Sequence, residues 1–258
     1  MAFKDRVLTP TSNRLKRGGA VFTSRPVIVG HRANTIRTLM KYLRVGVPMI
    51  EVDVRKRRGE LIVLHGPLSY QPVSVLGKLF KKLMYIILSG DPVVGKMPLE
   101  RVLRILNGKA GVWLDIKEKR IEDEIIKLLK KTKFKGPVVV SSTYHTVVKK
   151  FKEKMPEALC AISLSEEPVD LLQLVKSAKA DIVALEYLYA NEEIVETLHG
   201  NDVRVAVWTV NDPSMAKKLA NIGVDYIITD DPYTVMEILK GRRLYHRTIP
   251  RYLAMCAI

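Results

Sequence analysis

The sequence predicts an α/β fold, a (β/α)8 TIM barrel, and three observations predict it. Short runs rich in β-branched residues recur along the chain and are almost continuously apolar, as strands are when both faces of a sheet are covered. Helical patterns lie between many of these runs, and this alternation is typical of a parallel sheet with right-handed crossovers. A chain of 258 residues is also a normal length for one closed barrel. A doubly wound open sheet is the alternative.

Nine runs are candidate strands, although a barrel has places for eight. The link between the second and third runs is shorter than the dozen or more residues of a parallel crossover. We therefore expect the barrel to be irregular around its second and third strands. In order, the candidates are Val27 to His31, Met49 to Val54, Leu61 to His65, Gly111 to Ile116, Pro137 to Ser141, Leu159 to Ser163, Asp181 to Leu185, Val203 to Trp208 and Asp225 to Thr229.

Eight segments between or after these runs have the spacing of apolar residues that is typical of helices. In order, they are Thr35 to Val45, Pro98 to Asn107, Ile121 to Thr132, Thr146 to Lys154, Pro168 to Ser177, Glu192 to His199, Ser214 to Ile222 and Tyr233 to Lys240.

The chain is interpreted as a single barrel domain over residues 25–242, with an insertion at 67–97. Because 47% of the residues are hydrophobic, it can bury a full core. Residues 1–24 are a basic arm without periodicity, and residues 243–258 are a C-terminal tail.

The formal net charge is +16, from 43 basic and 27 acidic residues. A charge of this sign attracts nucleic acid, anionic lipid or substrates that carry phosphate. No homeodomain, zinc-finger or RNA-recognition signature is present, so we expect no specific nucleic-acid partner. The sequence leaves the oligomeric state open.

The longest apolar run, Leu83 to Leu88, is far shorter than the roughly 20 residues of a membrane-spanning helix. The first residues contain no apolar core typical of a secretory signal. Cys160 and Cys256 are the only cysteines, which excludes a disulfide framework. These features predict a cytoplasmic protein.

The segment from Val75 to Leu88 has apolar residues at helical spacing with lysines beside them. A basic amphipathic helix is what peripheral association with an anionic membrane requires. An ordinary helix that faces the core shows the same pattern, so both interpretations stay open.

Chemically active side chains gather at predicted strand ends. Residues two apart on a strand share a face, so Glu51 and Asp53 point the same way, as do Asp115 and Lys117. The carboxyl ends of all strands in a parallel barrel open on one rim. We therefore expect these two pairs to surround one cavity together with His31 and His65, which end the first and third runs.

Crowded carboxylates in a pocket of low dielectric stay ionised only if a cation sits among them. Glu51, Asp53 and Asp115 are therefore the candidate ligands of one divalent cation, and oxygen ligands favour Mg²⁺ or Ca²⁺. The two histidines are then available for proton transfer. Arg32 and Lys117 would add fixed positive charge for an anion such as phosphate.

Each signal alone has a plainer explanation. A histidine in an apolar run is more often a hydrogen-bonded core residue, and a Glu-x-Asp pair is commonly part of a structural ion-pair network. Their convergence on one predicted rim favours a site. We expect His145, His199 and His246 to be surface residues.

A longer series of motifs runs in one order along about 200 residues. Together the motifs resemble the glycerophosphodiester phosphodiesterase family, and the series is more specific than any single motif. They are His31-Arg32, Glu51-Val52-Asp53, the turn at Gly59, His65 after "LIVL", Met97 to Glu100, "LDIK" at Asp115 and Lys117, Ser142 after "VVVS", Trp208 to Asp212, Gly223 to Asp225, and Thr229 to Pro232.

The resemblance implies a TIM barrel, metal-dependent hydrolysis of glycerophosphodiesters to glycerol phosphate and an alcohol, and a cyclic phosphate on the way. It implies that His31 and His65 exchange general acid and base roles. By the same analogy the acidic residues bind the metal, Arg32 and Lys117 hold the phosphate, and Trp208 is an apolar wall for the substrate. A plain core role for Trp208 is the alternative.

The chain departs from the family pattern in its first loop and at two site positions. Ala33 stands where glycine is usual, and the Pro-Glu normally before Asn34 is missing. Gly66 stands where aspartate is usual, and Asp115 where glutamate is usual. The His-Gly pair and Asp115 also resemble sphingomyelinase D-like phospholipases.

Two alternative functions therefore stay open. One is lysophospholipase D or sphingomyelinase D-like activity on membrane lipids, so the substrate is a small molecule or a lysolipid phosphodiester. The other is a catalytically silent barrel that binds anionic lipid or nucleic acid.

Overall fold

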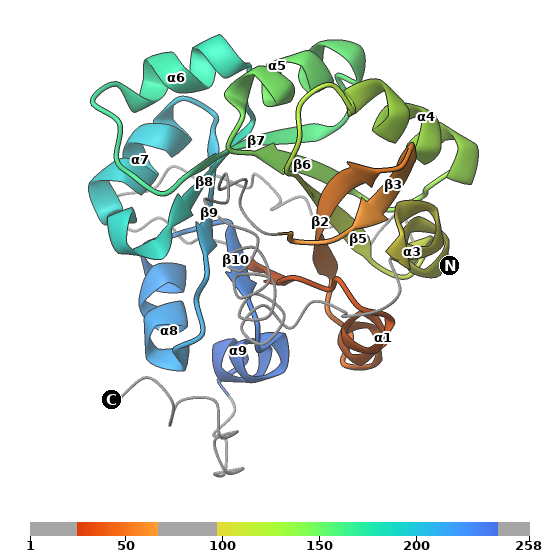
Figure 1. The fold of residues 1–258 in the computed structure, drawn as a ribbon. Coiled ribbons are helices and arrows are strands. Elements are labelled where there is room, and N and C mark those ends of the chain that lie inside the picture. Colours follow the sequence, from red (N-terminus) through yellow and green to blue (C-terminus); the bar gives the residue numbers. More distant parts are fainter. Residues whose placement is uncertain (1–24, 67–96, 242–258) are drawn as a thin grey trace, which may run out of the picture.

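The computed structural model describes residues 25–66 and 97–241, whose strands close into a barrel with helices around it (Figure 1). Most strands consist of buried, β-branched residues because each is covered by barrel interior on one side and helices on the other. The strands are β1 (Val27–Gly30), β2 (Met49–Arg57), β3 (Glu60–Val63), β4 (Met97–Pro98), β5 (Gly111–Ile116), β6 (Val138–Ser142), β7 (Leu159–Leu164), β8 (Ile182–Glu186), β9 (Arg204–Trp208) and β10 (Tyr226–Thr229).

Eight of these strands form the parallel barrel, in the order β1-β2-β5-β6-β7-β8-β9-β10. The ring closes because β1 pairs in parallel with β10 on one side and with β2 on the other. The (β/α)8 TIM barrel is thus confirmed, and the doubly wound open sheet is excluded.

The surplus strand is explained by a hairpin. β2 runs beyond the barrel to Arg57, and β3 returns antiparallel beside it, with Val54 opposite Val63. Arg58 and Gly59 join them with φ values of 52° and 83°, the backbone that a two-residue hairpin loop requires. β4 then pairs antiparallel with β3. The predicted irregularity at the second and third strands is confirmed, and the short link needs no crossover because the two strands are antiparallel.

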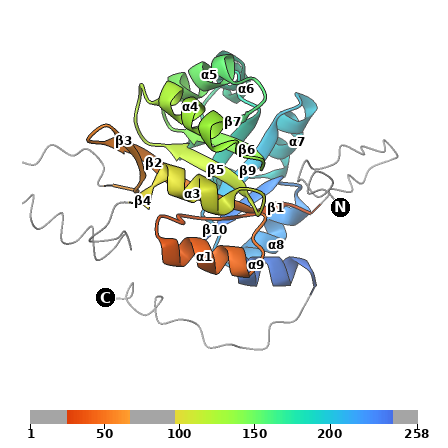
Figure 2. The ribbon, with the colours of Figure 1, turned by 90° about the vertical axis from the view of Figure 1, so that its right-hand side faces the viewer.

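All eight predicted helices are present, and Figures 1 and 2 show them around the outside of the barrel. One boundary was wrong by more than one residue: α6 begins at Leu171 and not at Pro168, because the Asp170 side chain accepts a hydrogen bond from Gln173 N and caps the helix there. The helices are α1 (Ile36–Arg44), α3 (Leu99–Leu106), α4 (Glu122–Thr132), α5 (His145–Lys154), α6 (Leu171–Ala178), α7 (Glu192–Gly200), α8 (Pro213–Asn221) and α9 (Pro232–Leu239), with a short 3₁₀ helix η2 (Tyr187–Tyr189).

The core has two layers. A larger one lies between the strands and the helices, and a smaller one fills the barrel. Inside the barrel, Trp113 packs edge to face on Tyr226, with ring centroids 5.5 Å apart, and donates a hydrogen bond to Ser141 Oγ. Met49 belongs to this interior layer, and the side chains two and four residues further along β2 are Glu51 and Asp53. The barrel floor is therefore apolar, and its polar side chains follow toward the carboxyl end.

Several sequence predictions fall outside the described residues. These are the arm at 1–24, the helix predicted from Val75 to Leu88, and the tail at 243–258 with His246 and Cys256. Among the residues that are described, no helix is both long and apolar enough to span a bilayer.

Gly30 is the last residue of β1, and its place is set by a close aromatic contact. A Cβ atom there would lie 2.5 Å from Tyr42 Cδ2. We expect Gly30→Ala to lower the free energy of unfolding by about 1–3 kcal/mol, because the buried ring has to move. Denaturant unfolding measures the loss.

Gly200→Ala is the matched control, since a Cβ atom at the end of α7 would meet nothing within 4 Å. An equal loss of stability in the two variants would show that the contact with Tyr42 does not constrain Gly30.

Candidate active site

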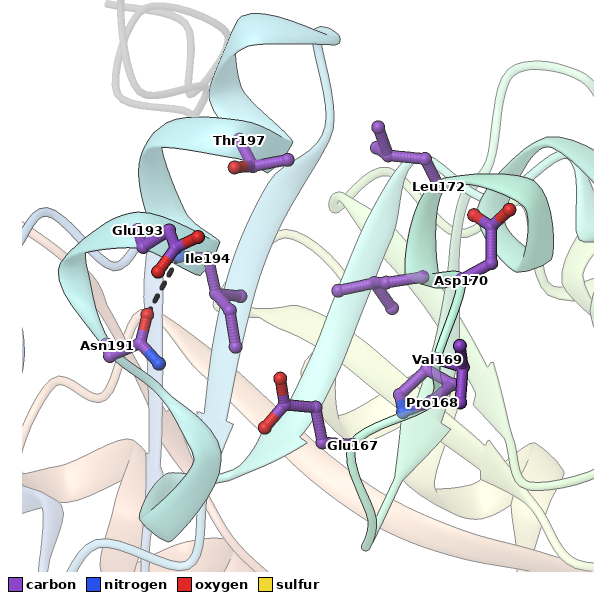
Figure 3. Close-up of a pocket in the computed structure, with 10 residues that line it drawn as sticks. Glu167, Pro168, Val169, Asp170, Leu172, Asn191, Glu193, Ile194 and Thr197 are labelled. Atoms are coloured by element: carbon purple, nitrogen blue, oxygen red, sulfur yellow. Dashed lines mark hydrogen bonds between the residues drawn. The ribbon is translucent and has the colours of Figure 1, made fainter.

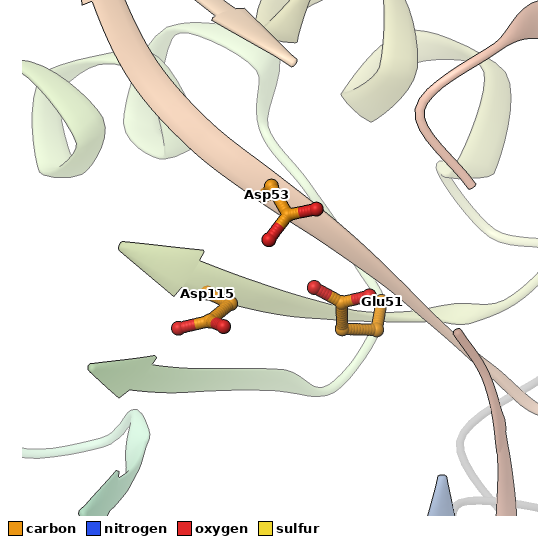
Figure 4. A group of neighbouring side chains, drawn as sticks. All are labelled: Glu51, Asp53 and Asp115. Carbon is orange, nitrogen blue, oxygen red and sulfur yellow. The ribbon is translucent and has the colours of Figure 1, made fainter. Parts of the chain in front are cut away.

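Three acidic side chains meet where β2 and β5 run side by side. The strand register places Asp53 beside Asp115, and Glu51 lies on the same face of β2. Ligand oxygens of all three lie within 4.8 Å of one another, and Figure 4 shows the three side chains grouped beside the neighbouring strands. Glu51 and Asp53 are only 3% and 1% exposed. The predicted acidic cluster is therefore present.

The structure holds these carboxylates in different ways. Burial, with the charges of Asp53 and Asp115, raises the pKa of Glu51 well above its usual value, although Arg32 N donates a hydrogen bond to Glu51 Oε2 at 2.6 Å. Burial also raises the pKa of Asp53, but hydrogen bonds and the nearby Lys117 outweigh it, so this pKa lies below its usual range. Of these two carboxylates, Glu51 is therefore the one that needs added positive charge to ionise.

Lys117 supplies part of that charge. Its Nζ lies 2.5 Å from Asp115 Oδ2 and 3.1 Å from Asp53 Oδ1. Burial lowers the pKa of Lys117, but the neighbouring carboxylates raise it further, so the ammonium stays charged. When all three acids are ionised, Lys117 neutralises one carboxylate and leaves two negative charges, which match one divalent cation.

The donor set fits such an ion. Asp115 Oδ1 is buried and has no hydrogen-bond partner among the described residues, although a buried carboxylate oxygen normally has one. The cluster offers only oxygen atoms, which suit Mg²⁺ or Ca²⁺. The unpartnered oxygen of Asp115, the raised pKa of Glu51 and the all-oxygen donor set each fit a divalent cation at this cluster.

His31 follows β1 directly and is held by a carboxylate from the neighbouring strand end. Its Nδ1 lies 2.8 Å from Asp230 Oδ1, just after β10. Asn211 Nδ2 donates to the other Asp230 oxygen at 2.8 Å. Burial raises the pKa of Asp230, but the hydrogen bond and charge of His31 bring it below its usual value. Asp230 therefore stays ionised and orients the His31 ring.

Tyr42 ties the two strand ends together from α1. Its hydroxyl group contacts the carbonyl oxygens of His31 at 3.0 Å and of Asp230 at 3.1 Å. Burial and nearby carboxylates raise the pKa of Tyr42, so the hydroxyl remains a donor. The backbone on both sides of the His31–Asp230 contact is thus fixed by one buried side chain.

His65 comes to the same rim from the hairpin. Leu64 N donates to Asp53 O, and His65 Nδ1 then lies 3.2 Å from Asp53 Oδ2. On the other side of the ring, Nε2 is 3.5 Å from Arg32 Nη2. A carboxylate holds Nδ1 of both histidines, an arrangement that orients Nε2 for proton transfer.

Asn34, Asp230, Asn211 and Tyr42 were not predicted as site residues. Asn34 is buried, donates to Asp53 Oδ2 and accepts from Asp53 N, so it fixes that carboxylate. Asp230 belongs to a motif noted in the sequence, at the carboxyl end of the last strand. Asp230 could have been identified from its position, because the last strand of a closed barrel pairs with the first and so brings Asp230 beside His31.

The departures from the family pattern are accommodated locally. Ala33 is fully buried, and its N–H donates to Glu51 O. Gly66 has φ of 75°, and a Cβ atom there would lie 2.5 Å from Nε of Arg55, which donates to His65 O. A side chain at position 66 would therefore displace the group that anchors the backbone of His65.

Other predicted residues lie as follows. Trp208 packs on the interior cluster, half-buried, and donates to Ala184 O. Ser142 bonds to Ile116 O and Tyr144 N, a structural role. His145 is half-buried at the start of α5. His199 is not a plain surface residue, because it pairs at 2.8 Å with Asp225, which precedes β10 and so lies at the opposite end of the barrel.

A cavity of about 320 Å³ lies between α6 and α7 (Figure 3). Its polar lining includes Glu167, Asp170 and Glu193, and none of the predicted site residues lines it. We therefore assign it no part in the chemistry of the acidic cluster.

Comparison with known proteins adds an independent finding. A family model described as the glycerophosphoryl diester phosphodiesterase family matches residues 100–234. A protein named glycerophosphodiester phosphodiesterase, from Caldanaerobacter subterraneus, is 26% identical over 237 residues, which cover 83% of this chain and 98% of that protein.

Solved structures share the fold at lower identity. A phosphodiesterase of Oleispira antarctica, solved with the product sn-glycerol-3-phosphate, has a TM-score of 0.68 and 19% identity over 84% of this chain and 97% of its own. A glycerophosphodiester phosphodiesterase of Parabacteroides distasonis has a TM-score of 0.67 and 21% identity over 86% of this chain and 99% of its own.

The raised pKa of Glu51 predicts how stability changes with pH in the presence of a chelator. The folded protein holds a proton on Glu51 that the unfolded chain releases near the ordinary value, so the free energy of unfolding falls as pH rises toward the raised pKa. We expect Glu51→Gln to lack this fall and to gain up to about 1.4 kcal/mol per pH unit over the wild type. Denaturant unfolding at about pH 5 to 8 measures the difference.

Glu60→Gln, an exposed glutamate on β3, is the control. A gain for Glu51→Gln that stays constant with pH would mean that the Glu51 carboxyl group is not held in an unfavourable charged setting.

Proposed function

The chain belongs to the glycerophosphoryl diester phosphodiesterase family and is a phosphoric diester hydrolase, and we propose that it converts glycerophosphodiesters to glycerol phosphate and an alcohol with the help of one divalent cation. The observation that carries the proposal is the meeting of two oriented imidazoles with the acidic cluster at one rim. The product bound by the Oleispira antarctica phosphodiesterase is the product that this reaction would release.

We assign the cation to Glu51, Asp53 and Asp115, which fit it in charge and donor type. When bound, such an ion polarises a phosphoryl oxygen and favours the ionised form of a hydroxyl group beside it. Arg32 and Lys117 are proposed to hold the phosphate, since both carry fixed positive charge next to the cluster. Trp208 is proposed as an apolar wall for glycerol.

The two histidines are proposed to move the protons. In the first step the glycerol hydroxyl next to the phosphate attacks phosphorus; one imidazole Nε2 takes its proton, and the other gives a proton to the departing alkoxide. The P–O bond to the alcohol breaks as the ring closes. Water then opens the cyclic phosphate with the two roles reversed, which restores both imidazoles.

The assay offers purified full-length protein glycerophosphocholine and lysophosphatidylcholine in parallel, with Mg²⁺ or Ca²⁺. We expect turnover of glycerophosphocholine that chelator removes, and a fall of about 10²- to 10⁴-fold in His31→Ala and His65→Ala. His145→Ala is the control, because it removes an imidazole that contacts neither the acidic cluster nor Asp230.

Each other result has a definite meaning. Turnover of the lysolipid alone would replace the proposed substrate by a membrane lipid. Activity that survives chelator would remove the cation from the proposal, and failure of both substrates with every ion would leave a silent barrel.

Asp230 is proposed as a positioning residue for His31. Asp230→Asn keeps the shape but loses the charge, so we expect kcat to fall roughly tenfold to a hundredfold, less than on loss of the imidazole, with KM little changed. Asp230→Glu should recover part of the loss. A change in KM alone would show that Asp230 contacts substrate instead.

A further inference from the structure

The exposed large hydrophobic side chains of the described residues share one location. Each follows a barrel strand at its carboxyl end, either in the loop or in the first turns of the next helix. The rim that carries His31 and the acidic cluster is thus also the rim that exposes apolar groups. The residues are Ile36, Met40, Tyr144, Val169, Leu188 and Tyr233, all at least 36% exposed.

Charge divides this rim into two sectors. The loops after β1, β2 and β5, together with the first turn of α1, carry the exposed basic residues Arg32, Arg37, Arg58, Lys119 and Arg120. We call this sector, with Ile36, Met40, Tyr144 and Tyr233, the basic rim. It is continuous, because β10, β1, β2, β5 and β6 are neighbours in the barrel.

The basic rim also contains acidic residues, among them Asp230 and Asp231 after β10, and each of these two makes a hydrogen bond or an ion pair. Glu118 contacts Arg57 Nη1 at 2.5 Å, and Asp230 contacts His31. Lys119 Nζ lies 4.8 Å from the centre of the Tyr144 ring, so a cation and an aromatic group are exposed together. Cationic and apolar groups are therefore exposed side by side on this part of the rim.

The other sector is acidic. Residues 165–170, 187–193 and 209–214, which follow β7, β8 and β9, contain no lysine or arginine. The cavity between α6 and α7 opens among these side chains (Figure 3). We call this sector the acidic rim; it contains Val169, Leu188, Glu166, Glu167, Asp170, Glu186, Glu192, Glu193 and Asp212.

We propose that the basic rim docks on an anionic lipid surface, with the acidic rim tilted away from it. Apolar side chains that enter the headgroup region and cations that meet anionic lipid are the two elements of interfacial binding. A negative surface would repel the acidic rim. Both sectors expose apolar groups, so it is their charge that decides which of them docks. Docking does not depend on turnover. Its consequence rests on the proposed function: the active site of the docked protein would face phosphodiester groups in the lipid surface.

Figures 1 and 2 show how the parts of this surface adjoin. α1, with Ile36, Arg37 and Met40, lies next to α9, with Tyr233 near its start, in both views. β1 and β10, which lead into these helices, are paired strands and carry His31 and Asp230 at their ends. A surface that meets these helix starts therefore lies beside one of the two histidines.

The test measures binding without turnover. Full-length protein is sedimented with vesicles of phosphatidylcholine containing phosphatidylglycerol, and with vesicles of phosphatidylcholine alone. We expect binding to the anionic vesicles, weakened by salt, and a rise of about tenfold or more in the lipid concentration for half-binding in Arg37→Gln/Lys119→Gln. Ile36→Ser/Met40→Ser should weaken binding by a similar factor.

Val169→Ser/Leu188→Ser is the matched control, since it removes two exposed apolar side chains from the acidic rim. The proposal expects no change in its vesicle binding. It is overturned if this control loses as much binding as the basic-rim variants, if those variants bind like the wild type, or if neutral vesicles bind equally well.

Orientation is tested directly with Met40→Trp and Leu188→Trp, in vesicles that contain brominated lipid. We expect added quenching of tryptophan emission for Met40→Trp and none for Leu188→Trp. Equal quenching at both positions would overturn the tilt, and no quenching at either would overturn insertion.

A duplex DNA probe separates lipid from nucleic acid. If Arg37→Gln/Lys119→Gln loses DNA binding but keeps vesicle binding, the basic rim is a nucleic-acid surface and the proposal fails. The vesicle and DNA tests measure binding only, and turnover of soluble glycerophosphocholine is measured separately. Failure of docking is therefore distinguishable from failure of the proposed function.

Discussion

Repulsion among buried carboxylates is the constraint on which the rest of the site depends. Parallel pairing of β2 and β5 places Asp53 beside Asp115 and brings Glu51 close to both, despite the repulsion between their negative charges. Such a cluster is tolerated only when donors and cations surround it. Lys117, Asn34, the Arg32 N–H and His65 all contact it. The same contacts that hold the acids therefore also place the groups proposed to handle phosphate and protons.

The two histidines reach the rim by different routes. His31 extends a barrel strand, and its neighbour Asp230 is 199 residues away in sequence, adjacent only because β10 closes on β1. His65 arrives through an antiparallel hairpin that rises above the barrel and returns to it. The hairpin ends where Leu64 bonds to Asp53, so the irregular part of the barrel is the part that delivers the second imidazole.

The rim around this site is unequal in charge. Its basic loops follow β1, β2 and β5, the strands that also supply His31, Glu51, Asp53 and Asp115. The acidic loops follow strands that contribute none of the residues proposed to act in catalysis or to hold the cation. Exposed basic side chains are thus concentrated around the site where an anionic substrate has to enter, and such charges guide anionic ligands toward a site.

The sequence alone determined the barrel, the eight helices, the acidic cluster and the two histidines, because strand periodicity and strand ends are local properties that a parallel barrel then gathers on one rim. It also identified an extra strand but could not pair it, since pairing depends on contacts between strands. Only the tertiary structure decided the partners: Asp230 for His31, Asn34 for Asp53, Tyr42 for two carbonyl groups, and Asp225 for His199. Closure of the barrel creates these contacts, and residues far apart in sequence leave no local pattern that predicts them.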